Sequence, residues 1–148
     1  MSELETFQFL ATLSAALFAG AAIYINVAEH PARMRLDTRS AAMQWAPSYK
    51  RATWMQAPLA IVSFLSGVGG WFLGGGLIWL VAALFIGAVV PITFIVIMPT
   101  NRQLLAAGRD LGSAETRRLL GRWGKLHGVR SITSAIATIL MLWGIFAA

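Results

Sequence analysis

The sequence predicts an all-α fold, an antiparallel bundle of four transmembrane helices with both termini on the non-cytoplasmic side. Hydrophobic residues make up 57% of the 148 residues and charged residues only 12%, whereas soluble domains carry about a quarter charged residues. All 12 Lys and Arg residues lie in two segments, 33–51 and 102–130. Short basic loops stay on the cytoplasmic side of a membrane. Four spans place both segments on that face and both termini opposite.

The first predicted span is Phe7–Ala28. Its apolar run is longer than the core of a secretory signal, and Glu3 and Glu5 stand where a signal would carry basic residues. We therefore expect a retained transmembrane helix that is long enough to cross a bilayer.

The second and third spans, about residues 54–73 and 77–99, are predicted to form a hairpin. No residue is charged from Ala52 to Asn101, and three glycines at 74–76 provide a tight turn. Before the hairpin lies a basic segment, 29–53. There Asp37 or Ser40 is expected to cap a short interfacial helix ending at Trp45. Pro47 would then occupy the first turn of the next helix.

The fourth span, 129–148, is predicted to continue a helix that begins in the second basic segment. Ser113 is a suitable N-cap, and Glu115 lies in the first turn. The chain is read as a single integral membrane domain, residues 1–148. Small residues allow helices in lipid to approach closely, and we expect Gly20 and Gly128 to do so beside the polar residues described next.

The polar residues of the first span gather at its cytoplasmic end. Asn26, Glu29, His30 and Arg33 follow the spacing i, i+3, i+4 and i+7 and so share one helical stripe. Pro31 disfavours helical geometry at the residue before it, which predicts a local irregularity in the helix.

A second polar stripe begins the fourth span. Trp123, His127 and Arg130 recur at helical spacing, and Asn101 ends the third span at a similar depth. Both histidines of the chain are thus expected at one membrane level. Ionisable groups at such depth usually face the bundle interior. The candidate catalytic residues are His30, His127, Arg130 and Glu29, and the candidate substrate-binding residues are Asn26, Asn101, Trp123 and Tyr24.

The same residues allow other interpretations. In a purely structural one, Glu29 pairs with Arg33 or Arg130, and the histidines hydrogen-bond nearby carbonyls. In another, His30 and His127 ligate haem axially or hold a metal ion. The absence of cysteine excludes thiolate metal sites and a cysteine nucleophile. We expect no cofactor and no metal.

Three segments carry a resemblance to a known family: residues 18–33 (FAGAAIYINVAEHPAR), 98–104 (MPTNRQL) and 122–130 (RWGKLHGVR). The chain resembles the anthrone oxygenase-like family of small four-span membrane proteins. The resemblance implies oxidation of an anthrone to an anthraquinone by O2, as its fungal members perform. The motif positions that carry over are Asn26, Glu29, His30, Pro31, Asn101, Trp123, His127 and Arg130.

The expected function is a cofactor-independent oxygenase in the membrane, acting on a hydrophobic anthrone- or quinone-like molecule. A histidine would act as the base, and Arg130 or an asparagine would stabilise the resulting oxyanion. The alternatives are a non-enzymatic transport or assembly subunit and a bis-histidine redox protein. The expected partners are lipid and a hydrophobic small molecule, not nucleic acid, and homo-oligomerisation stays open. The expected location is a bacterial inner membrane.

Reporter fusions test the predicted topology. Because basic loops are retained in the cytoplasm, fusions after Ala148 or within 74–76 should report the non-cytoplasmic side. Fusions near Arg39 and Gly112 should report the cytoplasm. A cytoplasmic C-terminus would reverse the orientation and place the polar residues on the outer leaflet.

Overall fold

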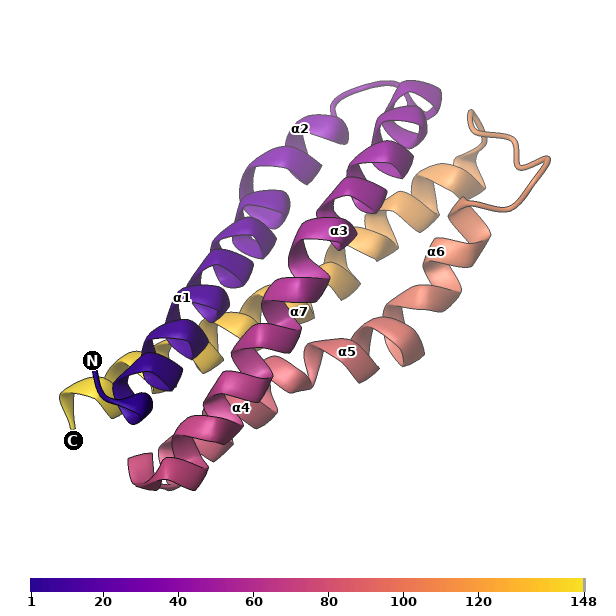
Figure 1. The fold of residues 1–148 in the computed structure, drawn as a ribbon. Helices are drawn as coiled ribbons and strands as arrows, with labels where there is room; N and C mark the ends of the chain where they lie inside the picture. The colour runs from indigo at the N-terminus through magenta and orange to yellow at the C-terminus, as the bar shows by residue number, and fades with distance from the viewer. Residues whose placement is uncertain (148) are drawn as a thin grey trace.

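Four helical rods make up the computed structural model, which describes residues 1–147 and is all-helical over that range (Figure 1). The rods are assembled from the following segments, in which η denotes a π-helical stretch: α1 (Glu3–Tyr24), η1 (Ile25–Glu29) and α2 (His30–Arg33); α3 (Thr38–Gly70) and η2 (Trp71–Gly75); α4 (Leu77–Gly87), α5 (Val89–Pro91), η3 (Ile92–Ile97) and α6 (Met98–Leu104); and α7 (Ala114–Phe146). The predicted fold class is confirmed.

Each rod is long and apolar enough to cross a membrane. The predicted spans 7–28, 54–73 and 77–99 fall within the first three rods, and 129–146 falls within the fourth. Ala148, the last residue of the predicted fourth span, lies outside the described residues. Ser113 caps α7 as expected, accepting a hydrogen bond from the backbone N–H of Thr116.

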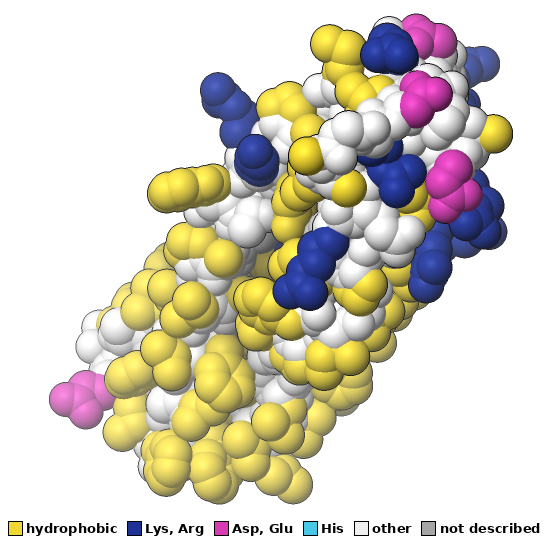
Figure 2. Space-filling view, turned by 90° about the vertical axis from the view of Figure 1, so that its right-hand side faces the viewer, with side chains coloured by type: hydrophobic (Ala, Val, Ile, Leu, Met, Phe, Trp, Pro, Cys, Tyr) yellow, Lys and Arg dark blue, Asp and Glu magenta, His cyan; other side chains and the backbone are white. Residues whose placement is uncertain are grey.

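The rods form a closed ring, because α1 and α4 each pack against both α3 and α7. Both termini lie at the same end as the turn before α4, and the α2–α3 and α6–α7 connections lie at the other end (Figure 1). On the face shown in Figure 2, basic side chains gather toward one end, and hydrophobic side chains cover much of the other end. Which end faces the cytoplasm stays a prediction.

One prediction about the second rod is wrong. The sequence suggested a short helix ending at Trp45 and a new helix starting near Pro47, but α3 runs unbroken through Pro47 and Pro58. Asp37 caps this long helix, accepting a hydrogen bond from the backbone N–H of Ser40 at 3.0 Å. Trp45 is buried against α7, and such packing offsets the hydrogen bond that a proline removes.

The π-helical turns η1 and η3 each end just before a proline. The backbone N–H of His30, before Pro31, bonds to the carbonyl of Ile25, five residues earlier. The N–H of Met98, before Pro99, bonds to Thr93 in the same way. The irregularity expected at Pro31 is therefore a widened turn, a feature that often occurs at functional sites.

The glycine turn between the second and third rods has the predicted position. Gly74 and Gly76 adopt φ angles of 91° and 87°, in the left-handed region that residues with a Cβ atom rarely occupy. The chain can therefore reverse here within a few residues.

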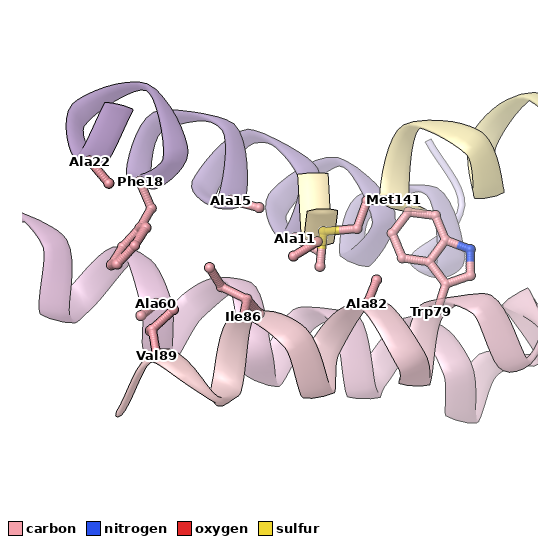
Figure 3. Packing of buried hydrophobic residues seen from close by; sticks show 11 residues of the cluster. Ala11, Ala15, Phe18, Ala22, Ala60, Trp79, Ala82, Ile86, Val89 and Met141 are labelled. Carbon is pink, nitrogen blue, oxygen red and sulfur yellow. The ribbon is translucent and has the colours of Figure 1, made fainter. Parts of the chain in front are cut away.

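Small residues fill the core near the termini. Alanines from all four rods surround Phe18, Trp79, Ile86 and Met141, which are fully buried (Figure 3). Because a methyl group takes little room, the backbones can approach closely and gain dispersion contacts. Gly20 has no such role, contrary to expectation, since a Cβ atom there would meet nothing within 4 Å.

Candidate functional site

Asn26 connects the first rod to α7. Its Nδ2 atom donates to the carbonyl oxygen of Gly124 at 2.9 Å, which fixes the orientation of the amide. Its Oδ1 atom accepts from Ser131 Oγ at 2.7 Å and lies 2.7 Å from Nδ1 of His127. An oxygen can only accept, so His127 carries its hydrogen on Nδ1. The other ring nitrogen, Nε2, then keeps a lone pair that can take a proton.

His30 has a different environment. Nη1 of Arg33 lies 3.2 Å from its Nδ1 atom, and because an arginine can only donate, the lone pair of that nitrogen is already engaged. The ring centroids of His30 and His127 lie 5.2 and 4.9 Å from that of Trp123. The structure therefore brings both histidines to one indole, on the same side of the bundle.

Arg33 is the centre of a buried charge network that the list of candidate residues omitted. Only 3% of the residue is exposed. It pairs with Glu29 and donates to Gln44, while Ser48 donates to the same carboxylate oxygen of Glu29. The i, i+4 spacing of Glu29 and Arg33 was the available signal. The Glu29 carboxylate is thus already neutralised.

Arg130 has no carboxylate partner within residues 1–147. Its Nη2 atom donates to Oε1 of Gln56 at 2.8 Å, and its Cζ atom lies 5.3 Å from the centre of the Phe18 ring. Its Nε atom is buried without a hydrogen-bond partner in the described chain. Arg130 is therefore a cation available to an anionic ligand.

Two adjoining cavities meet at Arg130. The first, here called the small cavity, has a volume of about 10 Å³ and is lined by Tyr49, Gln56, Trp123, His127, Arg130 and others. The second, the side cavity, has a volume of about 120 Å³, and its lining includes Phe18, Ala57, Val89, Phe94 and Met98. Tyr49, Thr53 and Arg130 line both.

A wider apolar groove of about 510 Å³ lies between α3 and the α4–α5 part of the third rod. It shares Ala60 and Val90 with the side cavity. Apolar walls therefore extend from the outer surface of the bundle to the guanidinium group of Arg130.

Three candidate binding residues, Asn26, Tyr24 and Asn101, are absent from the lining of both cavities. Tyr24 is 60% exposed and lines a separate surface hollow beside Glu29 and Arg51. Asn101 is fully buried on α6, and both polar atoms of its amide lack partners in the described chain.

Sequence reasoning missed Tyr49 and Gln56. Gln56 is the one amide side chain between Ala52 and Leu73, and a polar residue in an apolar span is a signal for function. Within residues 1–147, no three His, Cys, Asp or Glu side chains are grouped so as to hold a metal ion.

Comparison with known proteins identifies the family. The family model for anthrone oxygenase matches residues 45–140, which include Gln56, His127 and Arg130. This chain belongs to the anthrone oxygenase family. Among the family's curated members, it is 32% identical to the anthrone oxygenase ptaC of Pestalotiopsis fici over 132 residues, covering 74% of this chain and 90% of ptaC.

A second relative in the family matches over a shorter region. The chain is 40% identical to the anthrone oxygenase tpcL of Aspergillus fumigatus over 74 residues, covering 47% of this chain and 45% of tpcL. No solved structure matches the chain. Both relatives are fungal, and a bacterial inner-membrane location stays a prediction.

Gly124 provides a test of the packing around His30. A Cβ atom at position 124 would lie 2.5 Å from Cδ2 and Nε2 of the His30 ring, whereas one at Gly121 would meet nothing within 4 Å. Because His30 is held by Arg33 and Trp123, Gly124→Ala should destabilise the detergent-solubilised protein by about 1–3 kcal/mol. Gly121→Ala, on the same helix, should leave thermal unfolding unchanged or slightly raise its midpoint. Equal midpoints for the two variants would contradict the observed contact.

We expect Arg33 to contribute to the stability of the folded protein. Arg33→Met removes one partner of a largely buried ion pair, a change that typically costs about 3–5 kcal/mol. The thermal unfolding midpoint should fall clearly, whereas the exposed neighbour Arg35→Met serves as the control and should change it little. Similar midpoints for both variants would show that the network contributes no net stability.

Proposed function

We propose that this protein is a cofactor-independent oxygenase that oxidises a flat, hydrophobic, anthrone-like molecule inside the membrane. One observation carries the proposal: His127 keeps an Nε2 lone pair at the wall of the small cavity, and Arg130, a half-buried cation with no carboxylate partner in the described chain, lies at the wall of both the small cavity and the apolar side cavity. Membership of the anthrone oxygenase family supports the class of reaction.

Anthrone chemistry suits these groups. The CH2 carbon opposite the carbonyl is acidic, because loss of a proton gives an aromatic phenolate. His127 Nε2 accepts this proton as a general base, with Asn26 holding the ring in the required tautomer. Arg130 stabilises the negative charge, which is spread over the ring and its oxygen, in surroundings of low polarity where such an interaction is strong.

The reaction with dioxygen then balances without a metal or flavin. The carbanion transfers its electron pair to O2 and forms a carbon–oxygen bond, giving a peroxide anion. The His127 imidazolium returns a proton to the distal oxygen. The O–O bond and the remaining C–H bond break, leaving a carbonyl group and one water. One CH2 group and one O2 thus become one C=O group and one H2O.

The side cavity and the apolar groove provide a route for the substrate. A hydrophobic ring dissolved in lipid would enter between α3 and α5 and reach Arg130 without crossing water. The Pro91 region shapes this opening, since the third rod bends at α5 (Figure 1). Clefts lined by apolar side chains with few polar groups are typical of small-molecule sites.

The two histidines should respond differently to substitution. His127→Gln removes the base and should lower kcat by about 10²–10⁴-fold, the usual contribution of a general base. His30→Gln should retain most turnover, because the Nδ1 lone pair of His30 is already engaged by Arg33. The measurement is anthraquinone formation and dioxygen uptake with anthrone, using purified protein in nanodiscs.

Matched controls make the comparison decisive. Expression and unfolding midpoints of both variants show whether a loss of activity reflects loss of fold. Wild-type turnover in folded His127→Gln would refute the assignment of the base, and no turnover in the unmodified protein would refute the oxygenase function itself.

A further inference from the structure

The small cavity is surrounded by an excess of hydrogen-bond donors. Gln56 and Trp123 are 1% and 3% exposed, and Gln56 Nε2 and Trp123 Nε1 have no hydrogen-bond partner in the described chain. Nε of Arg130 is also unpartnered. All three side chains line the same cavity. Buried polar groups are nearly always paired, so three N–H groups without acceptors at one place require an explanation.

The hydrogen bond accepted by the side-chain oxygen of Gln56 fixes the orientation of its amide. Its Oε1 atom accepts from Nη2 of Arg130 at 2.8 Å, so the group that remains without a partner is the NH2 group. No carboxylate side chain is among the residues that line the small cavity. Among these lining residues, Arg130 is the one with a permanent charge. Donors, a cation and no carboxylate are the features of a site for an oxygen anion.

The size of the cavity limits the ligand. About 10 Å³ is close to the room that a single water molecule needs. A phenolate ring cannot enter it, whereas a single oxygen atom at the end of a bound peroxide, about the size of a water molecule, can. The small cavity also adjoins the side cavity through Tyr49, Thr53 and Arg130, and His127 forms part of its wall.

We propose that the small cavity is the dioxygen site, where the N–H groups of Gln56, Trp123 and Arg130 bind the peroxide oxygen that becomes negatively charged. The proposal rests on the proposed function. As the substrate carbanion forms its bond to one oxygen atom, the electron pair of that carbon passes to O2, and the distal oxygen takes the negative charge. That oxygen then receives the proton from the imidazolium of His127, which faces the same cavity.

Gln56 and Trp123 are therefore predicted to speed the oxygen step without being required to bind the organic substrate. Dioxygen itself is neutral and weakly bound. The donors act on the charge that develops during the reaction, and such interactions raise the rate rather than the ground-state affinity.

Chloride is a suitable probe, because it is a monatomic anion that accepts hydrogen bonds from N–H donors. Purified protein should broaden the 35Cl NMR signal at constant ionic strength, with sulfate as the balancing salt. Gln56→Glu keeps the shape of the side chain but replaces the NH2 donor with a carboxylate oxygen, and should abolish the broadening. Trp123→Phe removes one N–H and should reduce it. The exposed positions Gln103→Glu and Trp143→Phe are matched controls and should leave it unchanged.

Kinetics gives an independent readout. Chloride should inhibit competitively with dioxygen and not with anthrone. In Gln56→Glu, kcat/KM for dioxygen should fall about tenfold or more, as expected for the loss of one hydrogen bond to a charged group, while the KM for anthrone changes little. An equal fall in kcat/KM for dioxygen and for anthrone would show that Gln56 acts only on the general structure of the site.

The outcomes separate this inference from the proposed function. Chloride binding that Gln56→Glu abolishes, in a protein without turnover of anthrone, would support the anion site and refute the oxygenase function. Turnover without chloride binding, or with binding that Gln56→Glu leaves unchanged, would refute the anion site and leave the oxygenase function standing. In that case a single water molecule is the occupant of the cavity.

Discussion

The amide of Asn26 is the interaction on which the arrangement of the polar site depends. It joins the first and last rods through Gly124, Ser131 and His127. In an apolar bundle each buried polar group needs an internal partner, since lipid offers none. The widened turn before Pro31 carries Asn26, and Gly124 leaves room for the neighbouring histidine. One side chain thus sets both the distance between two helices and the tautomer of a histidine.

The buried polar residues are divided into two networks with different electrostatic roles. Around Arg33, positive and negative groups compensate one another within the first two rods. Around Arg130, the cation is held by an amide oxygen and by the face of an aromatic ring, neither of which cancels its charge. A compensated network stabilises the bundle, whereas an uncompensated cation at a cavity wall can bind an anion.

The fold could be predicted largely from the sequence. The length of the hydrophobic stretches and the grouping of Lys and Arg are properties of whole segments, and they indicate the four rods. A local signal was less reliable, since Pro47 suggested the start of a new helix where α3 in fact continues unbroken. The site was predicted less completely. Helical spacing suggested that His30, Trp123 and His127 lie near one another, and their rings are neighbours in the structure, but Tyr49 and Gln56 reach the small cavity from α3. No local pattern encodes which neighbouring helix supplies a cavity wall, because that depends on tertiary packing.

The apolar groove between α3 and the third rod opens on the side of the bundle rather than at either end. If substrate enters there, the bilayer acts as a reservoir, and the relevant substrate concentration is the one dissolved in lipid. A compound that partitions strongly into membranes would then saturate the protein at a low total concentration, and dilution with additional lipid would raise its apparent KM. Selectivity among related aromatic compounds would accordingly begin with their solubility in hydrocarbon, before any side chain distinguishes them.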